Sequence, residues 1–270
     1  MNLIESDVTA NQIKLHVYRT NSNKPPLLFA HGRSDNGLCF WPVAKQFTGE
    51  FEIILYDARG HGQSEKTESR TGLMDRVQDL AGLIEVLGLQ KPKLVGHSLG
   101  ALTVALFAGT YPDLPDCIVL EDPPPVEMMA SKSEEAMAHH KEWEEFVETI
   151  QGKSIAELVA LNRQDSPTWP EAEREPWALA KLQYQLKPFG EDYINAASGR
   201  QIIAQITCPM LMITADLDQG AITSPQAADE LVAGLPHARH VHIPGAGHNI
   251  RREQPEAYLT AVRDFLKACS

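Results

Sequence analysis

Residues 94–105 read LVGHSLGALTVA, an apolar stretch interrupted by Gly96-His97-Ser98-Leu99-Gly100. We interpret Val95 as the end of a buried strand and Leu99 as the start of a helix. The turn between them must then be so sharp that a β-carbon at position 96 or 100 would collide with nearby backbone, which glycine avoids. Such a turn holds its apical residue in a strained conformation above the sheet. Ser98 is therefore the candidate nucleophile.

Short apolar runs on both sides of this turn predict further buried strands. The predicted strands span residues 3–7, 13–18, 27–30, 51–56, 93–96, 117–120, 210–214 and 240–243. Helical patterns lie between several of these strands and predict parallel βαβ units, whereas the first two strands have no helix between them and predict an antiparallel hairpin. The expected fold class is α/β, with a mostly parallel eight-stranded sheet flanked by helices.

The alternation of strands and helices stops between residues 124 and 205. This segment contains helical periods, such as Trp143, Phe146 and Val147, and no clear strand. It predicts a helical cap inserted into one core domain. The core comprises residues 1–123 and 206–270, and the cap comprises residues 124–205.

The composition indicates an ordinary globular protein, with 43% hydrophobic and 22% charged residues. A formal net charge of -12 disfavours nucleic acid and anionic membrane as partners, because both attract clusters of Lys and Arg. The N-terminal stretch lacks a basic segment followed by an apolar one, so we expect a cytoplasmic protein. Its expected partner is a small molecule, and we expect a monomer or a homodimer.

A serine hydroxyl needs a base to remove its proton, and a histidine is the side chain best suited to this. Reactive groups in a parallel sheet gather at the carboxyl ends of the strands. His248 fits this position, since it follows the last predicted strand through Pro244-Gly245-Ala246-Gly247. By contrast, His240 and His242 alternate within that strand, and we interpret the loop of His61 as mainly turn-forming and supporting.

The imidazole in turn needs an acceptor for its second nitrogen, preferably a buried carboxylate. The strand at 210–214 is followed by Ala215-Asp216-Leu217-Asp218. We favour Asp218, because the first carboxylate after a strand usually makes turn hydrogen bonds while a later one reaches further. Asp216 remains an alternative, and Glu121-Asp122, after the strand before the cap, offers a second location.

A tetrahedral intermediate of acyl transfer carries a negative oxygen that requires two backbone N–H donors. Leu99, directly after the nucleophile, supplies one of them. The second is expected on the loop after the first parallel strand, where Gly32 permits close approach and the amide of Arg33 faces the oxyanion. This chemistry requires no metal and no organic cofactor.

Together these motifs resemble the α/β-hydrolase fold family. The resemblance is carried by His31-Gly32, by Asp57-x-Arg59-Gly60-His61-Gly62-x-Ser64, by the Ser98 turn, by Asp218 and by Gly247-His248, and it covers essentially the whole chain. It implies the order nucleophile, acid, histidine and a cap after the sixth strand. It also supports Asp218, although Ala215 stands where the family usually has glycine, which leaves Asp216 open.

The expected activity is that of a serine hydrolase acting on a small or medium-sized carboxylic ester or lactone through an acyl-enzyme. The expected substrate contacts are Gly32, His97, Trp143 and Phe146. One alternative is a ligand sensor that keeps a hydrolase-like pocket with little turnover. Another is a carbon–carbon bond hydrolase, which the sequence of the 31–37 loop disfavours because it departs from the pattern common in such enzymes.

Overall fold

The computed structural model describes residues 3–67, 72–130, 134–185 and 195–269, and its centre is one eight-stranded sheet. The strands are Ile4–Ala10 (β1), Ile13–Arg19 (β2), Pro26–Ala30 (β3), Glu52–Tyr56 (β4), Lys93–His97 (β5), Cys117–Glu121 (β6), Met210–Thr214 (β7) and Ala238–His242 (β8). Their order is β1-β2-β4-β3-β5-β6-β7-β8. The β1–β2 and β2–β4 pairs are antiparallel and the others are parallel. The predicted sheet and its edge hairpin are therefore confirmed.

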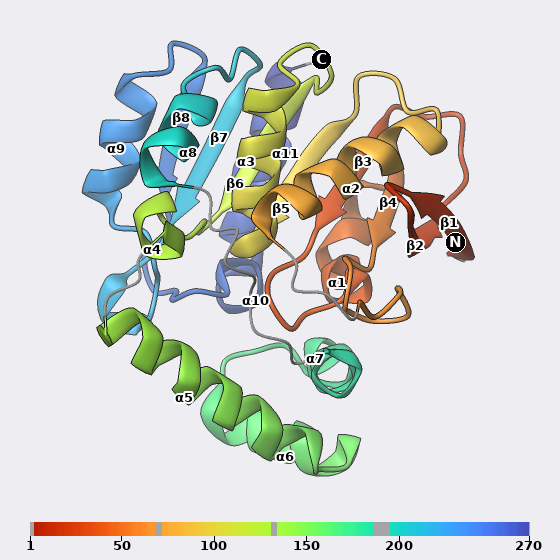
Figure 1. The fold of residues 1–270 in the computed structure, drawn as a ribbon, viewed down its shortest axis with the longest axis vertical. Coiled ribbons are helices and arrows are strands. Elements are labelled where there is room, and N and C mark those ends of the chain that lie inside the picture. Colours follow the sequence, from red (N-terminus) through yellow and green to blue (C-terminus); the bar gives the residue numbers. More distant parts are fainter. Residues whose placement is uncertain (1–2, 68–71, 131–133, 186–194, 270) are drawn as a thin grey trace.

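Helices cover the sheet and extend beyond one end of it (Figure 1). The α-helices are Trp41–Ala44 (α1), Leu73–Val86 (α2), Leu99–Thr110 (α3), Val126–Ala130 (α4), Glu134–Gln151 (α5), Ile155–Asp165 (α6), Glu171–Gln183 (α7), Ala196–Ile203 (α8), Pro225–Ala233 (α9), Ile250–Glu253 (α10) and Pro255–Ala268 (α11). Short 3-10 turns span Gly37–Phe40 (η1), Lys45–Phe47 (η2) and Leu217–Gln219 (η3). Within the described ranges, no helix is long and apolar enough to cross a membrane.

The sheet is apolar on both faces. Successive side chains of a strand point to opposite faces, and helices cover each face of the sheet. In β3, Leu28 and Ala30 join one cluster with residues of α2 and α3. Leu27 and Phe29 point to the other face and join a cluster with residues of α1 and α11. Full burial of each large side chain stabilises the fold by about 1.5–3 kcal/mol. The central strands are thus fixed from both sides, which gives their carboxyl ends a defined position.

The segment expected to form the cap divides into two parts. Figure 1 shows α5, α6 and α7 beyond the sheet, and they share a small separate cluster of Ile150, Leu158 and Ala178. In contrast, Val126 of α4 and Ile203 of α8 belong to the main core cluster. Among the described residues of the 124–205 segment, α4 and α8 therefore pack with the core helices, whereas α5–α7 lie beyond the sheet with a cluster of their own.

Candidate active site

Ser98 occupies the turn between β5 and α3, as the sequence predicts. Its backbone has φ 53° and ψ -124°, outside both helical and extended geometry. A β-carbon at Gly96 would lie 2.5 Å from Cα of Ala101, and one at Gly100 would collide with the carbonyl oxygen of Ala30. Glycine is required at both positions because backbone atoms occupy the space. A strained residue of this kind costs about 1–3 kcal/mol, which the surrounding packing must offset.

His248 lies on the loop after β8 and is hydrogen-bonded to a buried carboxylate. Its Nδ1 is 2.7 Å from Oδ2 of Asp122, whose side chain is wholly buried. The carboxylate also accepts from the amides of Ile222 and Thr223, each at 2.9 Å. Because an ionised carboxylate only accepts, we assign the imidazole proton to Nδ1. Nε2 is then the nitrogen with a lone pair for a proton.

Backbone contacts bring Ser98 and His248 to the same edge of the sheet. The amide of Ser98 donates to the carbonyl of Glu121 at 2.9 Å, directly before Asp122. The neighbouring His97 donates from Nε2 to the carbonyl of His248 at 2.9 Å, and the two rings lie 4.7 Å apart. Three loops, after β5, β6 and β8, therefore meet around Ser98.

The prediction that Asp218 orients His248 is wrong for this structure, in which Asp122 makes that contact. Asp218 lies in η3 and is exposed. Asp216, the other candidate after β7, accepts from Nε2 of His242 at 3.0 Å and from the amide of Gly245 at 2.7 Å. The loop after β7 thus contributes two backbone amides, which donate to Asp122, and its own carboxylates do not contact His248 in the described contacts. Asp122, kept only as an alternative, is the carboxylate that His248 contacts.

The loop after β3 lies directly against Ser98. A β-carbon at Gly32 would be 3.1 Å from Cβ of Ser98 and 2.8 Å from Nδ1 of His97. Arg33 is the next residue of this loop. Leu99 is the first residue of α3, where a backbone amide has no acceptor within the helix. The amides expected to bind an oxyanion therefore belong to two segments that flank the serine.

Two buried histidines brace this loop. The amide of Ala58 donates to Nε2 of His31 at 2.9 Å, and Nδ1 of His31 bonds the carbonyl of Gly32 at 2.8 Å. Burial lowers the pKa of His31 to about 4. The amide of Ser34 donates to Nε2 of His61 at 3.3 Å, and burial again lowers the pKa of this imidazole well below its ordinary value. Both rings are neutral supports, consistent with the supporting role that the sequence indicates for the His61 loop.

The residues expected to contact substrate differ in their surroundings. His97 is buried behind His248, and burial holds its pKa well below the ordinary value, so the structure gives it a supporting position. Trp143 of α5 lies with its ring centre 5.3 Å from Cζ of Arg33, which places it against the loop after β3. The ring of Phe146 is 5.6 Å from that of Trp143, and this residue is 41% exposed. Trp143 is thus the aromatic residue nearer the Ser98 loops.

A buried ionic cluster that no sequence motif indicates lies beside the site. Asp35, three residues after Gly32, bonds Arg251 and Arg252, which follow His248 in α10. The local signal of this cluster in the sequence is the consecutive pair Arg251-Arg252, and arginines are mostly exposed in folded proteins.

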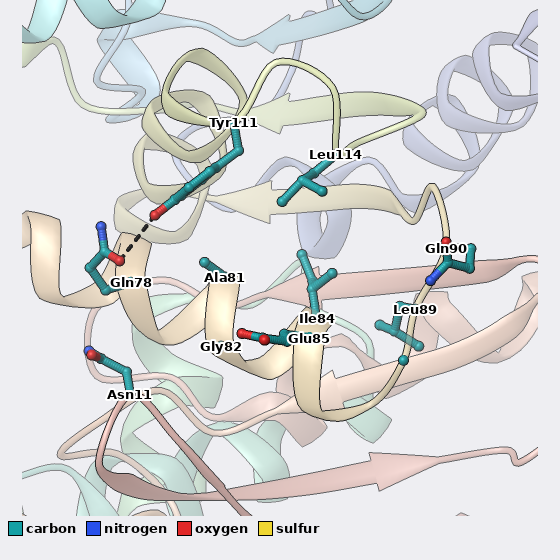
Figure 2. A pocket seen from close by; sticks show the side chains of 11 residues that line it. Asn11, Gln78, Ala81, Gly82, Ile84, Glu85, Leu89, Gln90, Tyr111 and Leu114 are labelled. Atoms are coloured by element: carbon teal, nitrogen blue, oxygen red, sulfur yellow. Dashed lines mark hydrogen bonds between the residues drawn. The ribbon is translucent and has the colours of Figure 1, made fainter.

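A hollow of about 540 Å³ lies elsewhere, against α2 and the segment after α3 (Figure 2). The hydroxyl of Tyr111 donates to Gln78 at its rim, at 3.0 Å. Its lining includes one carboxylate, Glu85, and neither a histidine nor a cysteine. None of the groups around Ser98 lines it, so the size of this hollow does not make it the catalytic site.

Known proteins resemble this chain over most of its length. Residues 25–252 match the family model described as the alpha/beta hydrolase fold. The 2-(acetamidomethylene)succinate hydrolase of Mesorhizobium japonicum is 29% identical over 98% of this chain and 96% of its own length. The esterase YbfF of Escherichia coli strain K12 is 25% identical, covering 94% of this chain and 98% of its own.

A solved structure shows the same likeness in three dimensions. The crystal structure of an E-2-(acetamidomethylene)succinate hydrolase superimposes with a TM-score of 0.74 at 26% identity, covering 98% of this chain and all of that one. The family match covers most of the chain and includes the Ser98 turn, Asp122 and His248. This chain belongs to the α/β-hydrolase family.

Proposed function

We propose that this protein is a serine hydrolase that cleaves a small or medium-sized carboxylic ester or lactone. The observation that carries the proposal is the hydrogen bond between His248 and the buried Asp122, 2.7 Å long, at the sheet edge where Ser98 stands on its strained turn. A surface histidine needs no such partner. A base that must hold its Nδ1 proton while Nε2 accepts another one does.

In this mechanism, Oγ of Ser98 attacks the carbonyl carbon while Nε2 of His248 removes the hydroxyl proton. Asp122 holds the tautomer and stabilises the imidazolium that forms. The amides of Arg33 and Leu99 bind the oxyanion of the tetrahedral intermediate. Collapse expels the alcohol, which takes the proton from His248, and leaves an acyl ester on Ser98. Water then attacks that ester by the same steps in reverse and releases the acid.

Replacing the nucleophile tests the proposal. Ser98→Ala should abolish both covalent labelling by a fluorophosphonate and release of p-nitrophenol from p-nitrophenyl acetate and butyrate, because no other group replaces the lost oxygen. Thr103→Ala is the matched control, since Thr103 is buried in α3 and its hydroxyl bonds the carbonyl of Leu99 at 2.8 Å. Sustained wild-type turnover supports an enzyme. A single slow turnover with tight ligand retention would instead favour the ligand sensor.

A second candidate is hydrolysis of an amide bond in a dicarboxylic acid by the same serine. It is favoured by the similarity to a protein named 2-(acetamidomethylene)succinate hydrolase and by the half-buried Arg33 at the junction of cap and core. A guanidinium there suits a carboxylate substituent on the substrate. Incubation with 2-(acetamidomethylene)succinate and measurement of acetate tests this candidate. Acetate release that depends on Ser98 supports it, and ester cleavage without acetate release rejects it.

A further inference from the structure

The strongest feature that the proposed mechanism does not use is the buried carboxylate of Asp35. Its Oδ2 accepts from Arg251 and from Arg252, each at 3.0 Å, and its Oδ1 accepts from Nζ of Lys181 at 3.2 Å. All four side chains are at most 7% exposed. Burial opposes ionisation of Asp35, but Arg252, Lys181 and Arg251 together hold its pKa well below the usual range.

The three cations come from two helices, α7 and α10, that are far apart in the sequence. Lys181 lies in α7, one of the helices over the strand ends, and its Nζ also donates to the carbonyl and hydroxyl oxygens of Ser34 at 3.0 and 2.9 Å. Arg251 and Arg252 lie in α10, which begins two residues after His248. Asp35 lies two residues after Arg33, on the loop after β3. One carboxylate thus joins the cap, the loop of the proposed oxyanion amide and the loop of the proposed base.

The cluster is balanced in formal charge. Arg251 contacts Glu121 at 3.4 Å, and Nε of Arg252 donates to Glu173 of α7 at 3.2 Å. With Asp35, these two glutamates give three carboxylates against three cations in the described cluster. A buried ion cluster adds little stability compared with apolar packing, whereas its hydrogen bonds fix orientation. Five ion pairs among these six side chains, at the point where the loops of the proposed site meet, therefore indicate control of geometry.

We propose that Asp35 and Lys181 are positioning residues that couple the seating of α7 to the alignment of the Arg33 amide and His248. The inference rests on the proposed function, since those groups are its oxyanion donor and base. When Lys181 is bonded to Asp35 and Ser34, the 32–35 segment is held toward the cap while the same carboxylate holds α10. Loss of the lysine releases the cap from this shared anchor.

The test compares Lys181→Met with Lys141→Met. Lys141 lies in α5, is exposed, and pairs only with Glu145 four residues on, among the contacts described. Lys181→Met should lower kcat for p-nitrophenyl acetate about tenfold or more with KM within about threefold, because misaligned donors weaken the transition state more than substrate binding. Lys141→Met should match wild type. A Lys181→Met enzyme with wild-type kcat overturns the proposal.

A charge-balanced variant separates positioning from stability. Lys181→Met leaves one uncompensated carboxylate, and Asp35→Asn leaves one uncompensated cation, so each should lower the thermal midpoint. The double variant restores neutrality with Glu121, Glu173, Arg251 and Arg252. We expect its midpoint to exceed that of either single variant while kcat stays low, since the anchor is still missing. Recovery of kcat together with the midpoint assigns the pair a purely structural role and overturns the proposal, even if Lys181→Met alone does not fold.

Lys181→Arg provides a conservative rescue. Arginine keeps the cation and has N–H donors for Asp35 and Ser34, so we expect kcat to recover at least partly relative to Lys181→Met. Failure of the proposed function gives a different result, since Ser98→Ala would then retain hydrolysis. If Ser98→Ala is inactive and the Lys181 variants behave as the Lys141 control does, only the positioning inference is rejected.

Discussion

The loops after β6 and after β7 begin alike in sequence and end with different tasks. Each carries a carboxylate one or two residues beyond a buried strand, Asp122 in the first and Asp216 in the second. Asp122 is wholly buried and contacts His248. Asp216 stays partly exposed, and the amide of Gly245, with His242, holds its pKa below the usual value. A carboxylate after a strand is therefore no sufficient sign of a triad acid.

The difference follows from sheet order. β6 lies beside β5, which carries Ser98, whereas β7 lies one strand further away. Asp122 has a positive φ of 41°, its carboxylate contacts His248, and the amides of Ile222 and Thr223 in the loop after β7 donate to it. The two loops thus cooperate, since one supplies the carboxylate and the other supplies the amides that hydrogen-bond to it and orient it.

The largest effect should come from Asp122→Asn. The new amide can donate to Nδ1 of His248 and thereby favour the wrong tautomer, so kcat should fall by roughly 10⁴, as in a serine protease triad. Its amide group would also face the N–H of Ile222 or Thr223. Asp218→Asn is the matched control and should leave kcat within about twofold, because that side chain is exposed. The opposite ranking of the two variants would return the role to the loop after β7.

Gly247→Ala should have an intermediate effect on kcat. It tests whether the loop after β7 supports the position of His248. A β-carbon at position 247 would collide with the carbonyl oxygen of Gln219, so the backbone beside His248 must move. Overpacking of this kind costs about 1–3 kcal/mol. We expect kcat to fall about 10–100-fold as the imidazole shifts, because misplacement of about 1 Å has such effects. Gly234→Ala is the control, because a β-carbon at position 234 makes only an ordinary van der Waals contact. Neither kcat nor the free energy of unfolding from chemical denaturation should change.

Asp216→Asn should have the smallest effect. The variant loses the anion that accepts from Gly245 and His242, so the thermal midpoint should fall slightly while kcat stays within about threefold. Thermal unfolding followed by circular dichroism, together with ester hydrolysis, measures both quantities. A loss of activity equal to that of Asp122→Asn, with the fold intact, would contradict the distinction between the two loops.

Much of the fold could be predicted from local pattern. Every predicted strand overlaps an observed one, and the central strands were the easiest to find because runs buried on both faces are continuously apolar. The Ser98 turn could also be predicted, because Gly96 and Gly100 lie within five residues of each other and a sharp turn leaves no room for a β-carbon at either position. The Asp35 cluster was not, since its members come from positions 35, 181, 251 and 252 and no short-range pattern joins them.

Local pattern was enough to predict the eight-stranded sheet, the serine at the sharp turn and the histidine on the glycine-containing loop, because each depends on periodicity or on sterics between near neighbours. The carboxylate that contacts His248 and the charges that surround Asp35 could be identified from the folded chain alone. Those choices depend on the order of strands in the sheet and on the path of loops over its edge. Residues equally suited by type are then separated by where the fold places them.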